Sequence, residues 1–162
     1  GHLGVAVFIV GVGLTSIYST EKDVSLRTGE SYELGGYTFA FKGVENRDGP
    51  NFRANRGTVE ITRDGEPVTV LYPEKRVYRV QTMPMTEAGI DAGFFRDLFV
   101  ALGDPLGANA WAVRLYHKPF IRWIWLGSLI MGIGATLAAT DRRYRVLARR
   151  ERELAAGTGA AA

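Results

Sequence analysis

The stretch Ile121 to Ala139 (IRWIWLGSLIMGIGATLAA) decides how this chain of 162 residues is organised. It is apolar apart from Arg122, and the tail 141–162 that follows holds six arginines against three acidic residues. A helix that crosses the ~30 Å hydrocarbon core of a bilayer needs about 20 residues, and cytoplasmic flanks carry an excess of arginine. We therefore predict a C-terminal transmembrane helix over 119–140, a basic and partly disordered cytoplasmic tail over 141–162, and an extracytoplasmic location for the residues before this helix.

A second apolar stretch, Leu3 to Tyr18, holds sixteen residues without a charge. At ~1.5 Å of rise per residue such a helix spans only ~24 Å, which predicts a transmembrane helix over 1–18 that is truncated at its start. A signal peptide is the alternative. The stretch lacks an initiator Met, a basic n-region and a small-x-small cleavage pattern, so we favour the transmembrane helix and expect the chain to be a fragment or a processed piece.

The middle of the chain, 19–118, has the composition of a soluble domain. It holds 13 Lys and Arg against 14 Asp and Glu, a formal balance of −1. The net charge of +3 and the pI near 9.3 therefore come from Arg122 and the tail, and they indicate topology rather than nucleic-acid binding. The chain has no cysteine, which excludes disulfides and thiolate metal sites although we expect this domain to lie in the oxidising periplasm.

Alternation of apolar and polar residues predicts β-strands in this middle domain. The run 31–44 is predicted as one half-buried strand interrupted at Gly35-Gly36, with Tyr37, Phe39 and Phe41 on one face. Further strands are predicted at 52–62, 67–72, 76–80 and 111–116, and the Asp64-Gly65 pair predicts a hairpin between the first two of these.

The run Thr86 to Gly103 is ambiguous, because its apolar residues recur at four-residue steps and also permit a helix. The glycines at 89 and 93 favour a turn followed by a strand at Asp97 to Leu102. The predicted fold is a membrane protein fragment in which two transmembrane α-helices flank a small all-β periplasmic domain, barrel- or sandwich-like, over 19–118.

Five sequence motifs follow one another along the chain: HLG (2–4), LYPEKR (71–76), MTEAGIDAGFFRDLFVALGDPLG (85–107), WAVRLYHKPFIRWIW (111–125) and DRRYR (141–145). Together they strongly resemble the C-terminal end of the CcmF family, the membrane haem lyase component of cytochrome c maturation. The resemblance covers nearly the whole chain except its Ala/Gly-rich end.

The resemblance implies the last two spans, and the periplasmic domain between them, of a large polytopic protein of the bacterial inner membrane. Members of the family take haem from a haem chaperone and join its vinyl groups to the cysteine thiols of a CXXCH apocytochrome c, alongside thiol-handling maturation subunits. The rest of the CcmF chain and membrane lipid are further expected partners. The family's tryptophan-rich haem-handling segment is absent from these residues, so we expect no catalysis from this piece alone.

The resemblance also implies one site residue, His2. In the family a histidine of the penultimate span pairs with a histidine of another span to hold a b-type haem in the membrane, and His2 stands in the matching HLG motif. Neutral imidazole is a strong iron ligand, and a ring buried in lipid has few structural reasons to be there. We expect His2 to be an axial haem ligand about 24 Å from Tyr18, in the cytoplasmic half of the bilayer.

His117, Arg122 and Trp123 are weaker candidates near the outer membrane interface. Such residues are typical of interfacial side chains and anchors. The alternatives are a contact of His117 with a haem propionate or the apocytochrome, and an ion pair of Arg122 with a propionate.

Two clusters of carboxylates, 87–97 and 64–74, would suit acid–base catalysis. Thioether formation is mainly a positioning task, so we expect these acids to bind turn amides, to pair with Arg76, Arg79 and Arg96, or to stay solvated. The sequence has no phosphate-binding loop and no Ser/His/Asp set. Two functions stay open: the terminal module of a haem lyase, and a two-span membrane scaffold whose β-domain binds a protein partner without any cofactor.

Overall fold

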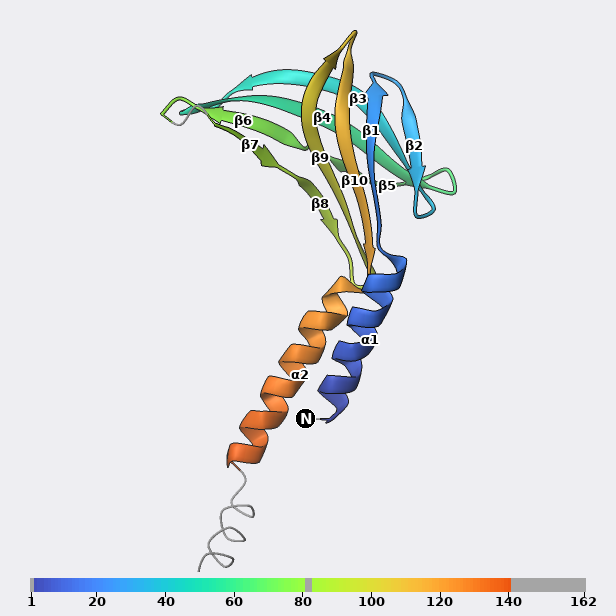
Figure 1. Ribbon diagram of the computed structural model, residues 1–162, viewed down its shortest axis with the longest axis vertical. Helices are drawn as coiled ribbons and strands as arrows, with labels where there is room; N and C mark the ends of the chain where they lie inside the picture. Colours follow the sequence, from blue (N-terminus) through green and yellow to red (C-terminus); the bar gives the residue numbers. More distant parts are fainter. Residues whose placement is uncertain (1, 81–82, 141–162) are drawn as a thin grey trace, which may run out of the picture. The chain divides into compact units, whose positions relative to one another are not determined.

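The computed structural model describes residues 2–80 and 83–140, so the predictions for the tail 141–162 lie outside the described residues. The described residues divide into two compact units, one made of 2–11 and 123–140 and the other lying within Val12–Arg122. The elements are, in order, α1 (His2–Tyr18), β1 (Thr20–Arg27), β2 (Ser31–Leu34), β3 (Tyr37–Asp48), β4 (Phe52–Arg63), β5 (Glu66–Leu71), β6 (Glu74–Tyr78), β7 (Pro84–Glu87), β8 (Gly89–Ala92), β9 (Arg96–Gly107), β10 (Ala110–Pro119) and α2 (Ile121–Thr140) (Figure 1).

The strands form two antiparallel sheets that face each other. One sheet has the order β1-β10-β9-β8, and the other has the order β2-β3-β4-β6-β7, with β5 paired to β4. Only Ala88 separates β7 from β8, so one extended segment passes from the second sheet to the first (Figure 1). The prediction of a small all-β domain is confirmed.

The core lies between the sheets and takes every second residue of the central strands. Alternate side chains of a strand point to opposite faces, so each sheet presents one apolar face to the other. Nine of these side chains are at most 1% exposed: Phe39, Phe41, Val59, Ile61, Leu98, Val100, Leu102, Val113 and Leu115. The predicted buried face of Tyr37, Phe39 and Phe41 is confirmed.

Two tight turns explain how the sequence folds into hairpins. Gly35 and Gly36 have φ of 60° and 77°, and Asp64 and Gly65 have φ of 52° and 83°. Two positive φ angles in a two-residue loop are the signature of the type I′ hairpin turn. The Asp64-Gly65 hairpin is confirmed, whereas the prediction of one strand over 31–44 is wrong, because the glycine pair reverses the chain between β2 and β3.

The ambiguous run 86–103 contains the end of β7, all of β8 and β9 as far as Gly103, so the strand predicted at Asp97 to Leu102 is confirmed and the helix is excluded. The turn predicted around the glycines is wrong at Gly89, which begins the strand β8. The sequence patterns missed β1, in which only Leu26 of eight residues is buried, since it is a charged edge strand. The last strand also runs further than predicted. β10 ends at Pro119 and α2 begins at Ile121, because Phe120 takes a positive φ of 58° that breaks the strand.

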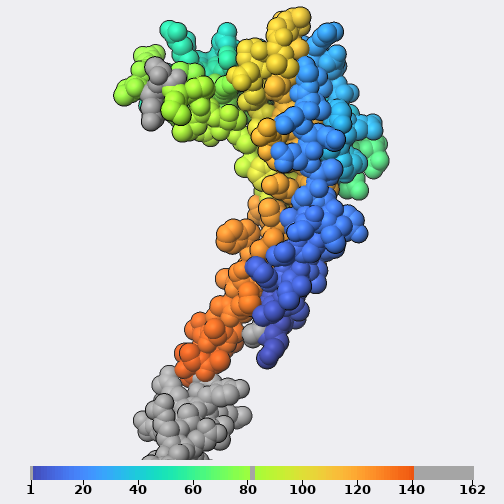
Figure 2. All heavy atoms as spheres, in the orientation of Figure 1, coloured from blue at the N-terminus to red at the C-terminus, as the bar shows by residue number. Residues whose placement is uncertain are grey.

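In the unit that holds residues 2–11 and 123–140, α1 lies against α2 (Figure 2). Glycines stand at this contact. A Cβ added at Gly4 would lie 2.7 Å from the backbone nitrogen of Met131, and one added at Gly127 would lie 2.5 Å from that of Phe8. Small residues let helix backbones approach this closely. By length and composition α2 can cross a membrane, whereas α1 has 17 residues and is shorter than such a helix, so the second predicted span stays a prediction.

Candidate functional site

His2 lies at the first described position of α1, with its side chain exposed. Gly4 marks the face of α1 that contacts α2. Each helical residue turns the direction by about 100°, so His2 lies about 200° from Gly4, on the opposite side of the helix. Ile9, which is 62% exposed, follows His2 by two turns on this same side. The imidazole is therefore available to a group that another segment holds.

His117 lies on β10, and its ring centroid is 5.7 Å from that of Tyr37 on β3 in the other sheet. Its Nδ1 is buried and has no hydrogen-bond partner among the described residues. Arg63 and Arg96 both donate to the Tyr37 hydroxyl, at 3.2 and 3.1 Å. Burial, together with the charges of Arg96 and Arg63, lowers the pKa of His117. These surroundings disfavour the protonated form of His117, and its predicted location near the outer interface stays a prediction.

Arg122 and Trp123 occupy the first turn of α2. The Arg122 Nε donates to Asp97 Oδ1 at 3.2 Å, and Asp97 also accepts from the Gly93 backbone N–H at 3.1 Å. The Trp123 backbone packs against α1, where its carbonyl carbon would lie 3.0 Å from a Cβ at Gly11. Arg122 therefore already has a carboxylate partner, and the anchoring role predicted for the two residues stays a prediction.

The acidic clusters are partners of arginine. Glu74, 7% exposed, accepts from Arg76 Nε at 2.8 Å and lies 3.8 Å from both Arg47 and Arg56. Arg76 also pairs with Glu87 at 3.3 Å, and Arg96 pairs with Asp91. The expected pairing with Arg76 and Arg96 and the turn-amide role of Asp97 are confirmed. Glu74, Glu87, Asp91 and Asp97 therefore each have an arginine partner.

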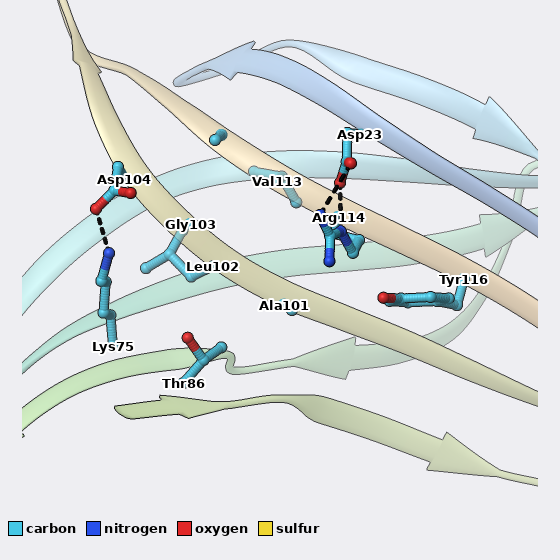
Figure 3. A pocket seen from close by; sticks show the side chains of 11 residues that line it. Asp23, Lys75, Thr86, Ala101, Leu102, Gly103, Asp104, Val113, Arg114 and Tyr116 are labelled. Atoms are coloured by element: carbon cyan, nitrogen blue, oxygen red, sulfur yellow. Dashed lines mark hydrogen bonds and ion pairs between the residues drawn. The ribbon is translucent and has the colours of Figure 1, made fainter. Parts of the chain in front are cut away.

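A hollow of ≈ 580 Å³ lies over β9 and β10 (Figure 3). Its lining residues are Asp23, Lys75, Thr86, Ala101, Leu102, Gly103, Asp104, Ala112, Val113, Arg114 and Tyr116. The four charged side chains of this lining pair with each other, Asp23 with Arg114 and Lys75 with Asp104. The described residues contain no group of three His, Cys, Asp or Glu side chains that could hold a metal ion. Of the predicted site residues, His117 lies beside the group around Tyr37, and Arg122 lies beside Asp97 of the acidic cluster.

The β-domain matches a family model described as the CcmF C-terminal beta-sandwich, over residues 17–119. The chain belongs to the CcmF family. It is 56% identical over 99% of its length to the cytochrome c-type biogenesis protein CcmF of Pseudomonas fluorescens. It is 51% identical over 89% of its length to the CcmF of Escherichia coli K12. The resemblance noted from the sequence is confirmed.

This chain spans about a quarter of the length of its CcmF relatives, 24% of the Pseudomonas fluorescens protein and 22% of the Escherichia coli protein. A solved structure named cytochrome c haem lyase CcmF has the same fold with a TM-score of 0.65 and 22% identity. The match covers 82% of this chain and 22% of that one. The match therefore extends beyond the β-domain to part of the helices, because the β-domain of 17–119 is shorter than 82% of the chain.

Sequence reasoning missed the group around Tyr37. Tyr37 was predicted only as a core residue, and its partners Arg63, Arg96 and His117 come from three other strands or turns, up to 80 positions away. A strand pattern reports which face a side chain occupies and gives no pairing between distant strands. The one local signal is the glycine pair itself, because a Cβ at Gly35 would lie 2.6 Å from the His117 ring.

Proposed function

We propose that this chain is the C-terminal helix–β-domain–helix part of a cytochrome c haem lyase. Its membership of the CcmF family and the biogenesis names of its relatives support a role in cytochrome c maturation. In this role the whole protein receives haem from a haem chaperone and promotes its attachment to the thiols of a CXXCH apocytochrome c. The proposed domain boundaries are those predicted from the sequence, with 19–118 in the periplasm and the tail on the cytoplasmic side of the inner membrane.

His2 is the proposed ligand of a resident haem b. The observation that carries this is the exposed imidazole on the side of α1 opposite to α2. A single neutral imidazole fits one axial position of haem iron, and the second ligand has to come from another span of the full-length protein. When bound, such a haem supplies one-electron chemistry. His2 holds and orients the group, and the exposed apolar side chains beside it exclude water.

The β-domain is proposed as a brace and a docking module for other maturation components rather than as a catalytic domain. The carboxylates of Glu74, Glu87, Asp91 and Asp97 each have an arginine partner, and the charged side chains that line its hollow are paired. Positioning the porphyrin against two thiols needs a rigid frame more than a proton shuttle. A core of nine nearly inaccessible side chains supplies that rigidity.

The test is a His2→Gly variant in a full-length CcmF protein that carries these residues. We expect the b-type haem absorbance of the purified protein to be lost and to return when imidazole is added, because imidazole can occupy the vacated axial position. Leu3→Ala is the matched control, since Leu3 is 70% exposed on the same turn and carries no ligand atom. Its spectrum should remain that of the parent protein.

An unchanged spectrum in His2→Gly would contradict the ligand role and favour the alternative, a membrane scaffold without cofactor. Loss of haem in both variants would show that this turn of α1 matters for folding rather than for ligation. Recovery by imidazole separates these cases, because a misfolded site does not regain a spectrum from a small ligand.

A further inference from the structure

The turn between β8 and β9 carries apolar side chains on its surface. Phe94 is 56% exposed and Phe95 is 61% exposed, and Ile90 on the adjoining strand is 53% exposed. The two phenyl rings contact each other edge to face, with centroids 5.1 Å apart. A soluble domain rarely displays two neighbouring phenylalanines and an isoleucine at one turn unless this surface meets an apolar partner.

This turn is bound to Phe120, the residue between β10 and α2. The Phe120 N–H donates to the Phe95 carbonyl at 2.8 Å, and the two rings contact edge to face at 6.2 Å. Phe120 itself takes a positive φ of 58°, a conformation that costs a bulky residue energy and persists only where the surroundings hold it. The turn between β8 and β9 is therefore held next to Phe120, where the chain enters α2.

Two further contacts hold the chain near this turn in place. Asp97, two residues after Phe95, accepts a hydrogen bond from Arg122 Nε of α2 at 3.2 Å. The Thr15 hydroxyl of α1 donates to the Pro119 carbonyl at 2.9 Å. The turn is thus tied to both helices at the end where they leave the β-domain.

We propose that Phe94 and Phe95 insert into the outer leaflet, at the boundary between headgroups and acyl chains, so that the β-domain binds the bilayer directly. This rests on the proposed function, in which α2 spans the membrane from Ile121. A span that starts next to Phe120 places its first residue at that boundary, and the exposed rings held beside it meet lipid. Apolar and aromatic side chains with cationic neighbours such as Arg122 suit this layer.

The experiment is site-directed spin labelling of the 162-residue chain in lipid nanodiscs. The chain has no cysteine, so each label needs one substitution only. The variants are Phe94→Cys, Phe95→Cys, Val80→Cys and Leu129→Cys, at positions that are 56, 61, 98 and 61% exposed. Power saturation then compares the accessibility of each nitroxide to oxygen, which partitions into lipid, and to a water-soluble nickel chelate. Far-UV circular dichroism checks that each variant is folded.

We expect the ratio of oxygen to nickel accessibility at positions 94 and 95 to exceed that at Val80 several-fold and to approach that at Leu129. A lipid-like ratio at Leu129 with a water-like ratio at 94 and 95 would overturn the proposal and leave the span of α2 intact. A water-like ratio at Leu129 would overturn both. Labels at 94 and 95 that neither reagent reaches would mean that protein covers the turn, which also overturns the proposal.

Discussion

The contact between α1 and α2 at Gly127 depends on the absence of a side chain. A Cβ added there would lie 2.5 Å from the backbone nitrogen of Phe8 and 2.7 Å from its Cα, and 2.8 Å from the Gly4 carbonyl oxygen. Non-bonded carbon atoms sit at about 3.5–4.0 Å, so Gly127→Ala forces the backbones apart by roughly 1 Å. Overpacking of this kind costs about 1–3 kcal/mol.

Gly132→Ala is the matched control, because nothing lies within 4 Å of the position where its Cβ would be. Both variants gain the same helix propensity, up to about 1 kcal/mol. The difference between their unfolding free energies therefore isolates the contact, and we expect Gly127→Ala to be less stable than Gly132→Ala by about 1–3 kcal/mol.

The measurement is unfolding by SDS in mixed micelles, followed by tryptophan fluorescence in a Trp111→Phe background, so that the signal comes from Trp123 and Trp125 at the start of α2. Circular dichroism of the starting states shows whether helix content is the same in the two variants. Equal stability of the two variants, or a more stable Gly127→Ala, would refute the close contact between the helices.

Three further predictions concern the β-domain. Burial first, and then two nearby guanidinium groups, lower the pKa of His117 in the folded domain. Below the usual histidine pKa of about 6.5 the unfolded chain therefore binds more protons than the folded one, and the free energy of unfolding should fall as the pH drops through this value. A His117→Leu variant should lose that pH dependence in urea titrations. Asp97→Asn should destabilise the domain by about 1–3 kcal/mol in thermal unfolding, since it weakens a nearly buried charged hydrogen bond. Asp23→Asn, on the exposed edge strand, should change the free energy of unfolding by less than about 1 kcal/mol. Similar losses in the two variants would contradict the assigned burial. Gly35→Ala and Gly36→Ala both place a side chain at a positive φ, but only the Cβ at 35 would meet the His117 ring, at 2.6 Å. Gly35→Ala should therefore be less stable than Gly36→Ala by at least about 1 kcal/mol. The reverse order of stability would contradict this contact.

The strands with strict alternation were predictable from the sequence because burial on one face is a local property. Phe39 and Phe41 illustrate this, since both are fully buried. The glycine pair before them misled the prediction, because a Gly-Gly sequence is compatible with either an interrupted strand or a type I′ turn. β1 escaped notice since its residues are mostly exposed and its place is set by pairing with β10, more than 80 positions away.

The site was predictable only where a motif or a local pattern carried it. The word HLG led to His2, and the fold adds the direction in which its imidazole points. The surroundings of His117 depend on Tyr37 in the other sheet, and no pattern within β10 indicates that neighbour. The predicted roles of Arg122 and Trp123 followed from composition. The hydrogen bond of Arg122 to Asp97 depends instead on the position of β9, which no pattern near Arg122 indicates.

The pairing of β1 with β10 has a consequence for how the domain can be exchanged. Thr20, two residues after the end of α1, lies opposite His117, which is four residues before the start of α2. Cross-strand partners of this kind have Cα atoms about 5 Å apart. The polypeptide thus leaves and returns at neighbouring points, and the hundred or so residues between form an insertion within a helical hairpin. Such a cassette can be swapped between family members, or replaced by a tight turn, while the spacing of the chain at this junction is kept.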